Sequence, residues 1–340
     1  MKRLVVVLIG VLAGFWAGAG WAQVNTPAGS ASASATESDV DQWLMRLHAA
    51  SRQSAYAGTF VVTAGGYMSS SRIWHVCDGQ QQVERVDALT GAPRSTFRRN
   101  DEVVTFLPAS RVVVHETRES LGLFPDLLKQ ADASVAQFYR LKAIGRGRVA
   151  GLEADIVQLV PVDAMRFGYR IWTEQKTGLV IKLQTLDSAR TVLEQAAFSE
   201  LQLGAPVAMA KLSALMDNTQ GYQVRIPELV KTTAAQEGWQ LKTGVPGFHP
   251  MSCHRRSDDE MPGSHGGTLQ CVFSDGLASV SLFIETYDPA RHGKLPQHEQ
   301  AAMGATQMLM RQLGSWWLTA VGEVPLQTLA MFAQGLERRK

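Results

Sequence analysis

A long series of short segments with two-residue periodicity constrains the fold more than any other feature. Tight turns such as Gly65-Gly66 and Asp78-Gly79 separate these segments, which is typical of strands. Connections this short force neighbouring strands to run antiparallel. We therefore predict an α+β fold with a large antiparallel sheet, whose strands cover residues 57–63, 72–77, 82–87, 95–99, 103–107, 111–116, 154–161, 166–173, 179–186 and 191–203.

Few helices accompany these strands. Residues 39–53 form a predicted helix, with Ser38 as its N-cap and one apolar face that includes Val40, Leu44 and Leu47. A second helical stretch is predicted over residues 126–139. So many strands with so few helices favour a strongly curved sheet that wraps over the helices and leaves an apolar hollow.

A second region follows a predicted interdomain linker at residues 204–221, which contains Gly204 and Pro206. Its Asp275-Gly276 pair is typical of a hairpin turn between two strands. We therefore predict an N-terminal domain over residues 39–203 and a smaller α+β domain over residues 222–335. The strands predicted in the second domain are 268–273, 278–287 and 316–321, and a helix is predicted over 326–336, before a basic end.

The first 22 residues have the three parts of a secretory signal peptide. Lys2 and Arg3 precede an uncharged apolar run, and Gly20-Trp21-Ala22 fits signal peptidase cleavage after Ala22. The alternative is a membrane anchor, but the run of about 17 residues is at the lower limit of a spanning helix and contains four glycines. Residues 23–38, rich in Ala, Ser and Thr, are a predicted flexible linker. The mature protein is therefore expected to be exported from the cytoplasm; the periplasm is the compartment that the family resemblance given below implies.

Charge argues against nucleic acid as a partner. The whole chain has 33 basic and 31 acidic residues, and cleavage removes Lys2 and Arg3, which leaves 31 of each. A nucleic-acid-binding domain normally carries a basic excess. The short basic groups Arg98-Arg99, Arg146-Gly-Arg148 and Arg255-Arg256 are interpreted first as solvated turns, and alternatively as sites for phosphate or carboxylate groups.

The cysteines admit two interpretations. Cys253 and Cys271 are 18 residues apart in one region, and a disulfide between them would stabilise the fold by about 3 kcal/mol in an oxidising compartment. With neighbouring histidines they could instead bind zinc, but the spacing is not that of a known zinc module. We expect the disulfide, no metal site and no cofactor. The complete metal candidate group is His249, Cys253, His254, His265 and Cys271.

No catalytic motif is present in the sequence. The G-x-S-x-G, H-E-x-x-H, P-loop and C-x-x-C patterns are all absent. We therefore predict a binding protein with no catalytic residues. The large apolar residues of the first domain either fill a packed core or line a cavity for an acyl chain, and periodicity does not separate these possibilities. They are Phe60, Ile73, Trp74, Phe106, Phe167 and Trp172.

Several short motifs, in order along nearly the whole mature chain, resemble one family. In the second domain the clearest are Val245-Pro-Gly-Phe248, Phe273-Ser-Asp-Gly-Leu277 and Val321-Gly-Glu-Val-Pro325. The chain resembles the periplasmic sigma-E regulators of the RseB/MucB type. The motifs of the first domain are Tyr56-Ala-Gly-Thr-Phe60, the Arg98–Phe106 hairpin, Gly145–Leu152 and Tyr169-Arg-Ile-Trp172.

The resemblance implies a fold and a function. The first domain would have the half-barrel of the lipoprotein carriers LolA and LolB, wrapped around helices. The protein would bind the periplasmic region of a membrane anti-sigma factor of the RseA/MucA kind and shield it from site-one proteolysis. Lipopolysaccharide or a lipoprotein acyl chain would release the shield, and homo-oligomers are a further candidate assembly. The alternative is a LolA/LolB-like lipoprotein or lipid carrier.

Overall fold

The computed structural model describes residues 37–117, 124, 135–256, 267–293 and 300–339, all of which belong to one compact unit. The predicted signal peptide, the linker up to residue 36 and most of the predicted helix 126–139 lie outside the described residues. Within the described ranges, none of the helices combines the length and apolar character needed to cross a membrane.

Twelve of the described strands form one sheet, in which strands adjacent in the chain are mostly adjacent in space. The order is β12-β6-β5-β4-β3-β2-β1-β11-β10-β9-β8-β7, and all pairs are antiparallel except β12 with β6. The predicted α+β class with a large antiparallel sheet is confirmed. The strands are β1 Tyr56–Ala64, β2 Tyr67–Cys77, β3 Gln82–Ala88, β4 Ser95–Arg99, β5 Glu102–Leu107, β6 Val112–Thr117, β7 Tyr139–Val149, β8 Leu152–Pro161, β9 Gly168–Glu174, β10 Val180–Leu186, β11 Val192–Leu203 and β12 Gln223–Arg225.

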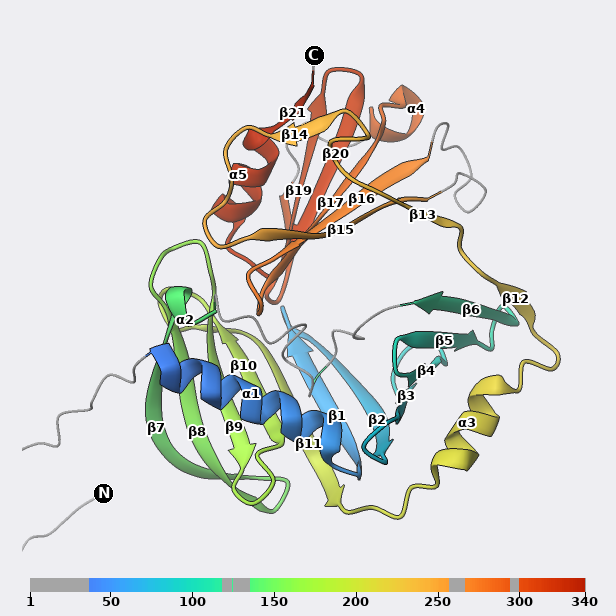
Figure 1. Cartoon of the computed structure of the whole chain (residues 1–340), viewed down its shortest axis with the longest axis vertical. Helices are drawn as coiled ribbons and strands as arrows, with labels where there is room; N and C mark the ends of the chain where they lie inside the picture. The colour runs from blue at the N-terminus through green and yellow to red at the C-terminus, as the bar shows by residue number, and fades with distance from the viewer. Residues whose placement is uncertain (1–36, 118–123, 125–134, 257–266, 294–299, 340) are drawn as a thin grey trace, which may run out of the picture. The chain divides into compact units, whose positions relative to one another are not determined.

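Helix α1 (Glu37–Gln53) lies across the concave face of this sheet (Figure 1). Its apolar face is the predicted one: Val40, Leu44 and Leu47 are at most 4% exposed and join the same core as Phe60 and Ile73 of the sheet. The helix begins two residues before its predicted start, within the usual variation of helix ends. The sheet therefore curves around a helix, as its strand-rich pattern predicts.

Strand β7 was missed in the sequence analysis, which placed helix up to Tyr139 and no strand before Ala154. Only α2 (Val135–Phe138) is helical among the described residues of that stretch. The middle of this edge strand, residues 142–146, is exposed on both faces, so the apolar alternation that begins with Tyr139 and Leu141 is too short to predict a strand. Its basic side chains and the bulge between Ala143 and Gly145 are typical protections of a free sheet edge.

The second sheet has seven strands in the order β13-β15-β16-β17-β20-β19-β18. Helix α5 (Leu326–Gly335) buries Leu329 and Phe332 against it. The hairpin and final helix agree with the prediction, whereas β13, β15, β18 and β19 were missed. The strands are β13 Leu229–Thr232, β15 His249–Arg256, β16 Thr268–Ser274, β17 Ser279–Thr286, β18 Gln300–Met303, β19 Thr306–Leu313 and β20 Trp316–Gly322, and a short helix α4 covers Pro289–His292.

The basic end of the chain does not extend the last helix. Residues Leu336–Arg338 form strand β21, which pairs with β14 (Trp239–Leu241). The Arg338 guanidinium lies 5.1 Å from the ring centre of Trp239 and 5.0 Å from that of Trp316. Cation–π contacts with two indoles, which this short pairing positions, account for the basic residue here.

Candidate functional site

Arg166 lies at the centre of a buried contact between the two sheets. It belongs to the connection between β8 and β9, and its side chain is fully buried. Nε donates to Asp275 Oδ2 at 2.6 Å, Nη2 donates to the carbonyl oxygen of Pro246 at 2.6 Å, and Nη1 donates to Asp163 Oδ2. All three nitrogens of the guanidinium therefore have a partner, which is what a buried charge requires.

Aromatic rings and a glycine complete the surroundings of Arg166. The guanidinium carbon lies 4.0 Å from the ring centre of Phe138 and 5.0 Å from that of Phe248. Gly247 has a φ of +78°, and a Cβ at this position would lie 2.2 Å from Arg166 Nη2. Three residues of the Val245-Pro-Gly-Phe248 motif thus contact Arg166: Pro246 through its carbonyl oxygen, Gly247 through its missing side chain, and Phe248 through its ring.

Asp275 joins the hairpin turn between β16 and β17 to this contact. Its Oδ1 accepts from the backbone N–H groups of Leu277 (3.0 Å) and Ala278 (2.7 Å), while Oδ2 accepts from Arg166 and from the hydroxyl of Tyr139 (3.4 Å). Burial raises the pKa of Asp275, and the Arg166 charge opposes this shift. One carboxylate therefore both shapes the turn and binds the other sheet.

The first turn of α5 binds the same connection. The Thr328 hydroxyl donates to the carbonyl oxygen of Met165 at 2.8 Å, and the Gln327 side chain donates to that of Ala164. We call the contacts among Arg166, Asp163, Asp275, Pro246 and Thr328 the Arg166 junction. Three elements of the second sheet's region bind the β8–β9 connection there: the Val245–Phe248 motif, the turn between β16 and β17, and helix α5.

A cavity of about 330 Å³ lies on the concave side of the first sheet. Leu44 of α1 and Phe60 of β1 are among its apolar walls, and Leu277 and Glu323 reach it from the second sheet's region. Leu277 also packs against the core of the first sheet. The hairpin that carries Asp275 thus closes part of the cavity, which has the size of a small ligand site.

The six predicted cavity residues do not lie together. Phe60 lines the cavity, and Ile73 is fully buried in the adjoining core. Phe106 is on the opposite face of the sheet, where it packs with Phe97 and with Met216 of α3 (Met209–Asp217). The prediction was wrong for Phe106 because strand alternation reverses the face at each residue, and a list of large side chains ignores that alternation.

The cavity prediction was also wrong for Trp74 and Trp172, because strand alternation places them on the other face of the sheet. It was wrong for Phe167 for a different reason. Trp74 lies outward beside Arg72 and Arg85, with guanidinium carbons 5.4 and 5.2 Å from its ring centre, and Trp172 lies under Lys182 Nζ at 4.6 Å. Phe167 is buried at the end of the β8–β9 connection and does not line the cavity.

A second contact between the sheets lies at the polar end of the cavity. Glu194 Oε2 accepts a long hydrogen bond (3.5 Å) from the backbone N–H of Ala305. The turns at Gly65 and Gly304 meet here, since a Cβ on Gly304 would lie 2.6 Å from that of Ala64. Burial, and then the charge of Glu323, raise the pKa of Glu194. We call this the Glu194 contact.

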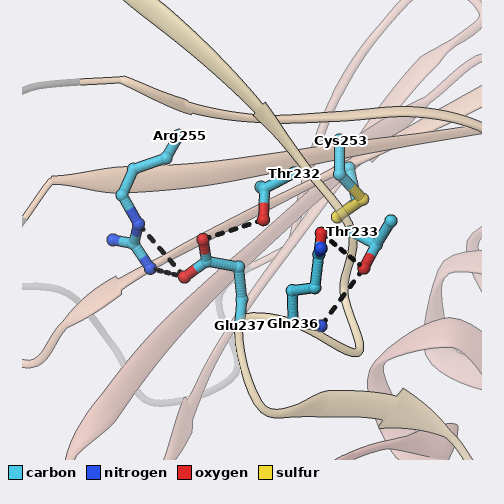
Figure 2. Close-up of a disulfide and its surroundings, with 7 residues drawn as sticks. Thr232, Thr233, Gln236, Glu237, Cys253 and Arg255 are labelled. Carbon is cyan, nitrogen blue, oxygen red and sulfur yellow. Dashed lines mark hydrogen bonds and ion pairs between the residues drawn. A yellow bond between two sulfur atoms is a disulfide. The ribbon is translucent and has the colours of Figure 1, made fainter.

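The structure joins Cys253 and Cys271 by a disulfide. The two residues are directly opposite in the β15–β16 pairing, with their Cα atoms 4.1 Å apart. Figure 2 shows Glu237 close by, where it accepts from Arg255 and from the Thr232 hydroxyl and so fastens the edge strand β13. The bonded sulfurs cannot act as thiolate ligands, and His265 of the metal candidate group lies outside the described residues.

Five of the six arginines in the basic groups have carboxylate partners within the chain. Arg98 forms a buried ion pair with Glu84, and Arg99 binds Glu102 and Asp217. Arg146 pairs with Asp155, Arg148 with Glu153 and Arg255 with Glu237. Pairing within the chain, partly exposed, accounts for these five arginines without a bound phosphate.

The sequence analysis missed the residues of the Arg166 junction. It placed Arg166 inside a strand and recognised Asp275 only as a turn residue. The motifs Val245–Phe248 and Phe273–Leu277 did contain the partners, so their joint occurrence was the available signal. Their meeting point on Arg166, 109 positions from Asp275, was not visible in any local pattern.

Two family models match the chain. The model described as the MucB/RseB N-terminal domain matches residues 39–216, and the one described as the MucB/RseB C-terminal domain matches residues 233–337. The first alone covers more than half of the 340 residues.

Individual proteins match over most of their length. The sigma factor AlgU regulatory protein MucB of Pseudomonas aeruginosa is 29% identical over 300 residues, which are 85% of this chain and 88% of that protein. The sigma-E factor regulatory protein RseB of Haemophilus influenzae is 23% identical over 312 residues, 91% of this chain and 95% of that protein. A chain from the solved complex of Pseudomonas aeruginosa MucA/MucB superposes with a TM-score of 0.70 at 27% identity, covering 89% of this chain and 99% of that one.

Proposed function

We propose that this chain, which belongs to the MucB/RseB family, is a periplasmic negative regulator of the sigma-E envelope stress response. It binds the periplasmic region of a membrane anti-sigma factor and shields that region from site-one proteolysis. An acyl chain from lipopolysaccharide or a lipoprotein releases the shield. The chain acts by binding and not by catalysis.

The likeness to the MucB chain solved together with MucA carries this proposal. The superposition covers 89% of the chain, so both sheets contribute to it. A partner that touches both sheets needs them in a fixed arrangement. The fully buried Arg166–Asp275 pair supports such an arrangement, because a buried ion pair tolerates little displacement of either charge.

Shielding requires only that the partner's cleavage site be occupied. A dissociation constant of micromolar or better corresponds to about 8 kcal/mol of binding free energy or more. An interface of ordinary size, burying about 1,600 Å², suffices for that affinity. No nucleophile or metal is needed for this role, and the regulatory names of the relatives agree with it.

The position of Leu277 supports release by a lipid. This residue lines the cavity, and two positions earlier Asp275 binds Arg166. A ligand that displaces Leu277 therefore acts on the turn that holds the Arg166 junction. If lipid and anti-sigma factor prefer different arrangements of the sheets by a few kcal/mol, binding of one reduces binding of the other.

A periplasmic location agrees with the predicted signal peptide and with the disulfide. The predicted signal peptide exports the chain, and the oxidising compartment maintains the Cys253–Cys271 disulfide. The mature chain there meets both the outward region of a membrane anti-sigma factor and the lipids of the envelope.

Protection from proteolysis tests the proposal directly. A purified periplasmic anti-sigma fragment would be incubated with its site-one protease, with and without the mature chain, and then with added lipid. We expect cleavage to slow in proportion to the bound fraction and to recover when lipid is added. Unchanged cleavage at chain concentrations above 10-fold the fragment's, or no binding in a direct titration, would refute the shielding role.

The cavity also favours a second function, that of a lipoprotein or lipid carrier. A carrier needs the curved sheet and the cavity, most of whose lining residues lie within 39–203, whereas Leu277 and Glu323 add only part of the wall. The discriminating measurement is transfer of an acylated protein between two vesicle populations. Transfer by residues 39–203 alone, together with absent anti-sigma binding by the whole mature chain, would favour the carrier.

A further inference from the structure

The outer face of the first sheet, which is the face opposite the cavity, carries a strip of cationic and amide side chains. Ile171 lines the cavity, so its neighbours Arg170 and Trp172 lie on the outer face. Lys182 is directly opposite Trp172 in the β9–β10 pairing and shares that face. The adjacent cross-strand row, from β7 to β11, contains Lys142, Gln158, Arg170, Gln184 and Gln195. We call this row, together with Trp172 and Lys182, the outer strip, and none of its residues is acidic.

The cations of the outer strip differ from two arginines of the neighbouring edge strand. Arg146 and Arg148 of β7 form ion pairs with carboxylates of β8. Within the part of the chain that the structure describes, no ion pair involves Lys142, Arg170 or Lys182. The positive potential of the strip is therefore not compensated by the chain itself, and it favours an anionic ligand.

Arg170 and Lys182, at the centre of the strip, are positioned by weak contacts. Lys182 Nζ lies 4.6 Å from the ring centre of Trp172, and Arg170 Nη1 donates to Gln184 Oε1 over a long 3.5 Å. Burial, and then the charge of Arg170, lower the pKa of Lys182. The two cations are diagonal neighbours on adjacent strands, so one anion can contact both. Such an anion would accept stronger hydrogen bonds and reduce the repulsion between them.

The part of the outer face that the chain covers itself has a different character. At β4 and β5, Phe97 and Phe106 pack with Met216 of α3, and this part of the face is apolar. The outer strip is polar, and Arg170 and Lys182 are only half-buried. A polar, cationic surface of this kind is suited to a charged partner and not to an apolar helix.

We propose that the outer strip binds an acidic peptide segment of another protein, whose carboxylates contact Lys142, Arg170 and Lys182. The glutamines of the row favour a polypeptide, because a side-chain amide both donates and accepts, as the peptide groups of the partner do. Strands about 4.8 Å apart make the row from β7 to β11 about 19 Å long, so an extended segment of about six residues spans it. The Trp172 indole provides a contact for one apolar side chain. This inference goes beyond the proposed function, since it needs neither the cavity nor the anti-sigma factor.

The test compares two matched peptides. The mature chain would be titrated, with fluorescence anisotropy as the readout, with a labelled glutamate-rich peptide that contains one leucine, and with the same peptide in which glutamine replaces every glutamate. We expect the glutamate peptide to bind about tenfold more tightly, as one charge-assisted hydrogen bond allows. Its binding should weaken at high salt, which screens exposed charges. Equal binding of the two peptides, binding of neither, or binding that salt does not change overturns the inference.

A double substitution locates the preference. In the variant Arg170→Gln, Lys182→Gln we expect the tenfold preference for the glutamate peptide to disappear. The matched control is Lys211→Gln, Lys231→Gln, which removes the same charge from exposed positions on α3 and β13 and should keep the preference. A preference that survives in the first variant, or an equal loss in the control, overturns the assignment to the strip. Lys142→Gln is a second variant on an exposed edge strand, where the fold does not depend on the side chain, and it should weaken binding of the glutamate peptide while leaving the glutamine peptide unchanged.

A membrane surface is the other anionic partner to be tested. The mature chain and the Arg170→Gln, Lys182→Gln variant would each be sedimented with phosphatidylglycerol vesicles. We expect the two to sediment equally, because the strip is assigned to a peptide. Sedimentation that the substitutions abolish, together with no binding of the glutamate peptide, overturns the acidic peptide as the partner.

Discussion

The Arg166 junction and the Glu194 contact join the same two sheets in opposite ways. At the junction a guanidinium with no exposed surface binds a carboxylate with none. At the Glu194 contact a carboxylate makes one hydrogen bond of 3.5 Å and lies near a second carboxylate. The first contact is dry and fully paired, whereas the second is half-buried and carries like charges.

This difference indicates which contact can open. Separating a buried ion pair leaves two charges without water, which is costly, while separating the Glu194 contact relieves repulsion. The polar end of the cavity lies at the Glu194 contact. If the two sheets move relative to each other, we therefore expect the Arg166 junction to act as the pivot and the Glu194 contact to separate.

The largest expected effect comes from removing the buried charge. Asp275→Asn keeps the shape of the turn but leaves Arg166 without its buried partner, and should lower the free energy of unfolding by about 3 kcal/mol or more. Denaturant unfolding measures this. The control is Asp155→Asn, whose pair with Arg146 is exposed and should matter by less than about 1 kcal/mol. Equal effects of the two would mean that the junction is no stronger than a surface pair.

Removing the disulfide tests whether the hairpin alone supports the junction. The double variant Cys253→Ser, Cys271→Ser opens a bridge between positions 18 apart and should cost about 3 kcal/mol. Because Arg166 and Asp275 do not touch the cysteines, the cost should add to that of Asp275→Asn within about 0.5 kcal/mol. Strong non-additivity in unfolding of the combined variant would show that the junction depends on the bridge.

Leu277 lies between the two contacts and should have an intermediate effect. Leu277→Ala removes a half-buried side chain from the cavity wall and should cost about 1–2 kcal/mol, below the range for a fully buried leucine. Unfolding of the variant in denaturant gives the value. A loss as large as that of Asp275→Asn would place Leu277 in the core and not at a displaceable wall.

The smallest effect is expected at Glu194 and depends on pH. Because the folded protein raises the pKa of Glu194, protonation favours the folded state, and that contribution is lost as pH rises through the folded pKa. Glu194→Gln should therefore be slightly more stable than the parent at neutral pH, by at most about 0.5 kcal/mol, with the difference vanishing below pH of about 4. Thermal unfolding between these pH values measures it, and a less stable variant at neutral pH would contradict the repulsion.

Local patterns predicted most of the strands of the first sheet. Two-residue periodicity with Gly-containing turns located β1 to β6 and β8 to β11, and the helical spacing of Val40, Leu44 and Leu47 located α1. These features depend on residues a few positions apart. Strand β7 was missed because its apolar alternation stops after Leu141 and its middle is exposed, and β13, β15, β18 and β19 of the second sheet were also missed.

The sequence by itself determined the antiparallel architecture, because short turns leave no other way to pair the strands. It also contained the family motifs and brought Cys253 and Cys271 into one region. Only the tertiary structure decided which side chains face the cavity, since one residue of register exchanges the two faces, and Trp74, Phe106 and Trp172 lie on the other side. It alone brought Arg166 to Asp275, because a pair 109 positions apart depends on how the two sheets pack against each other.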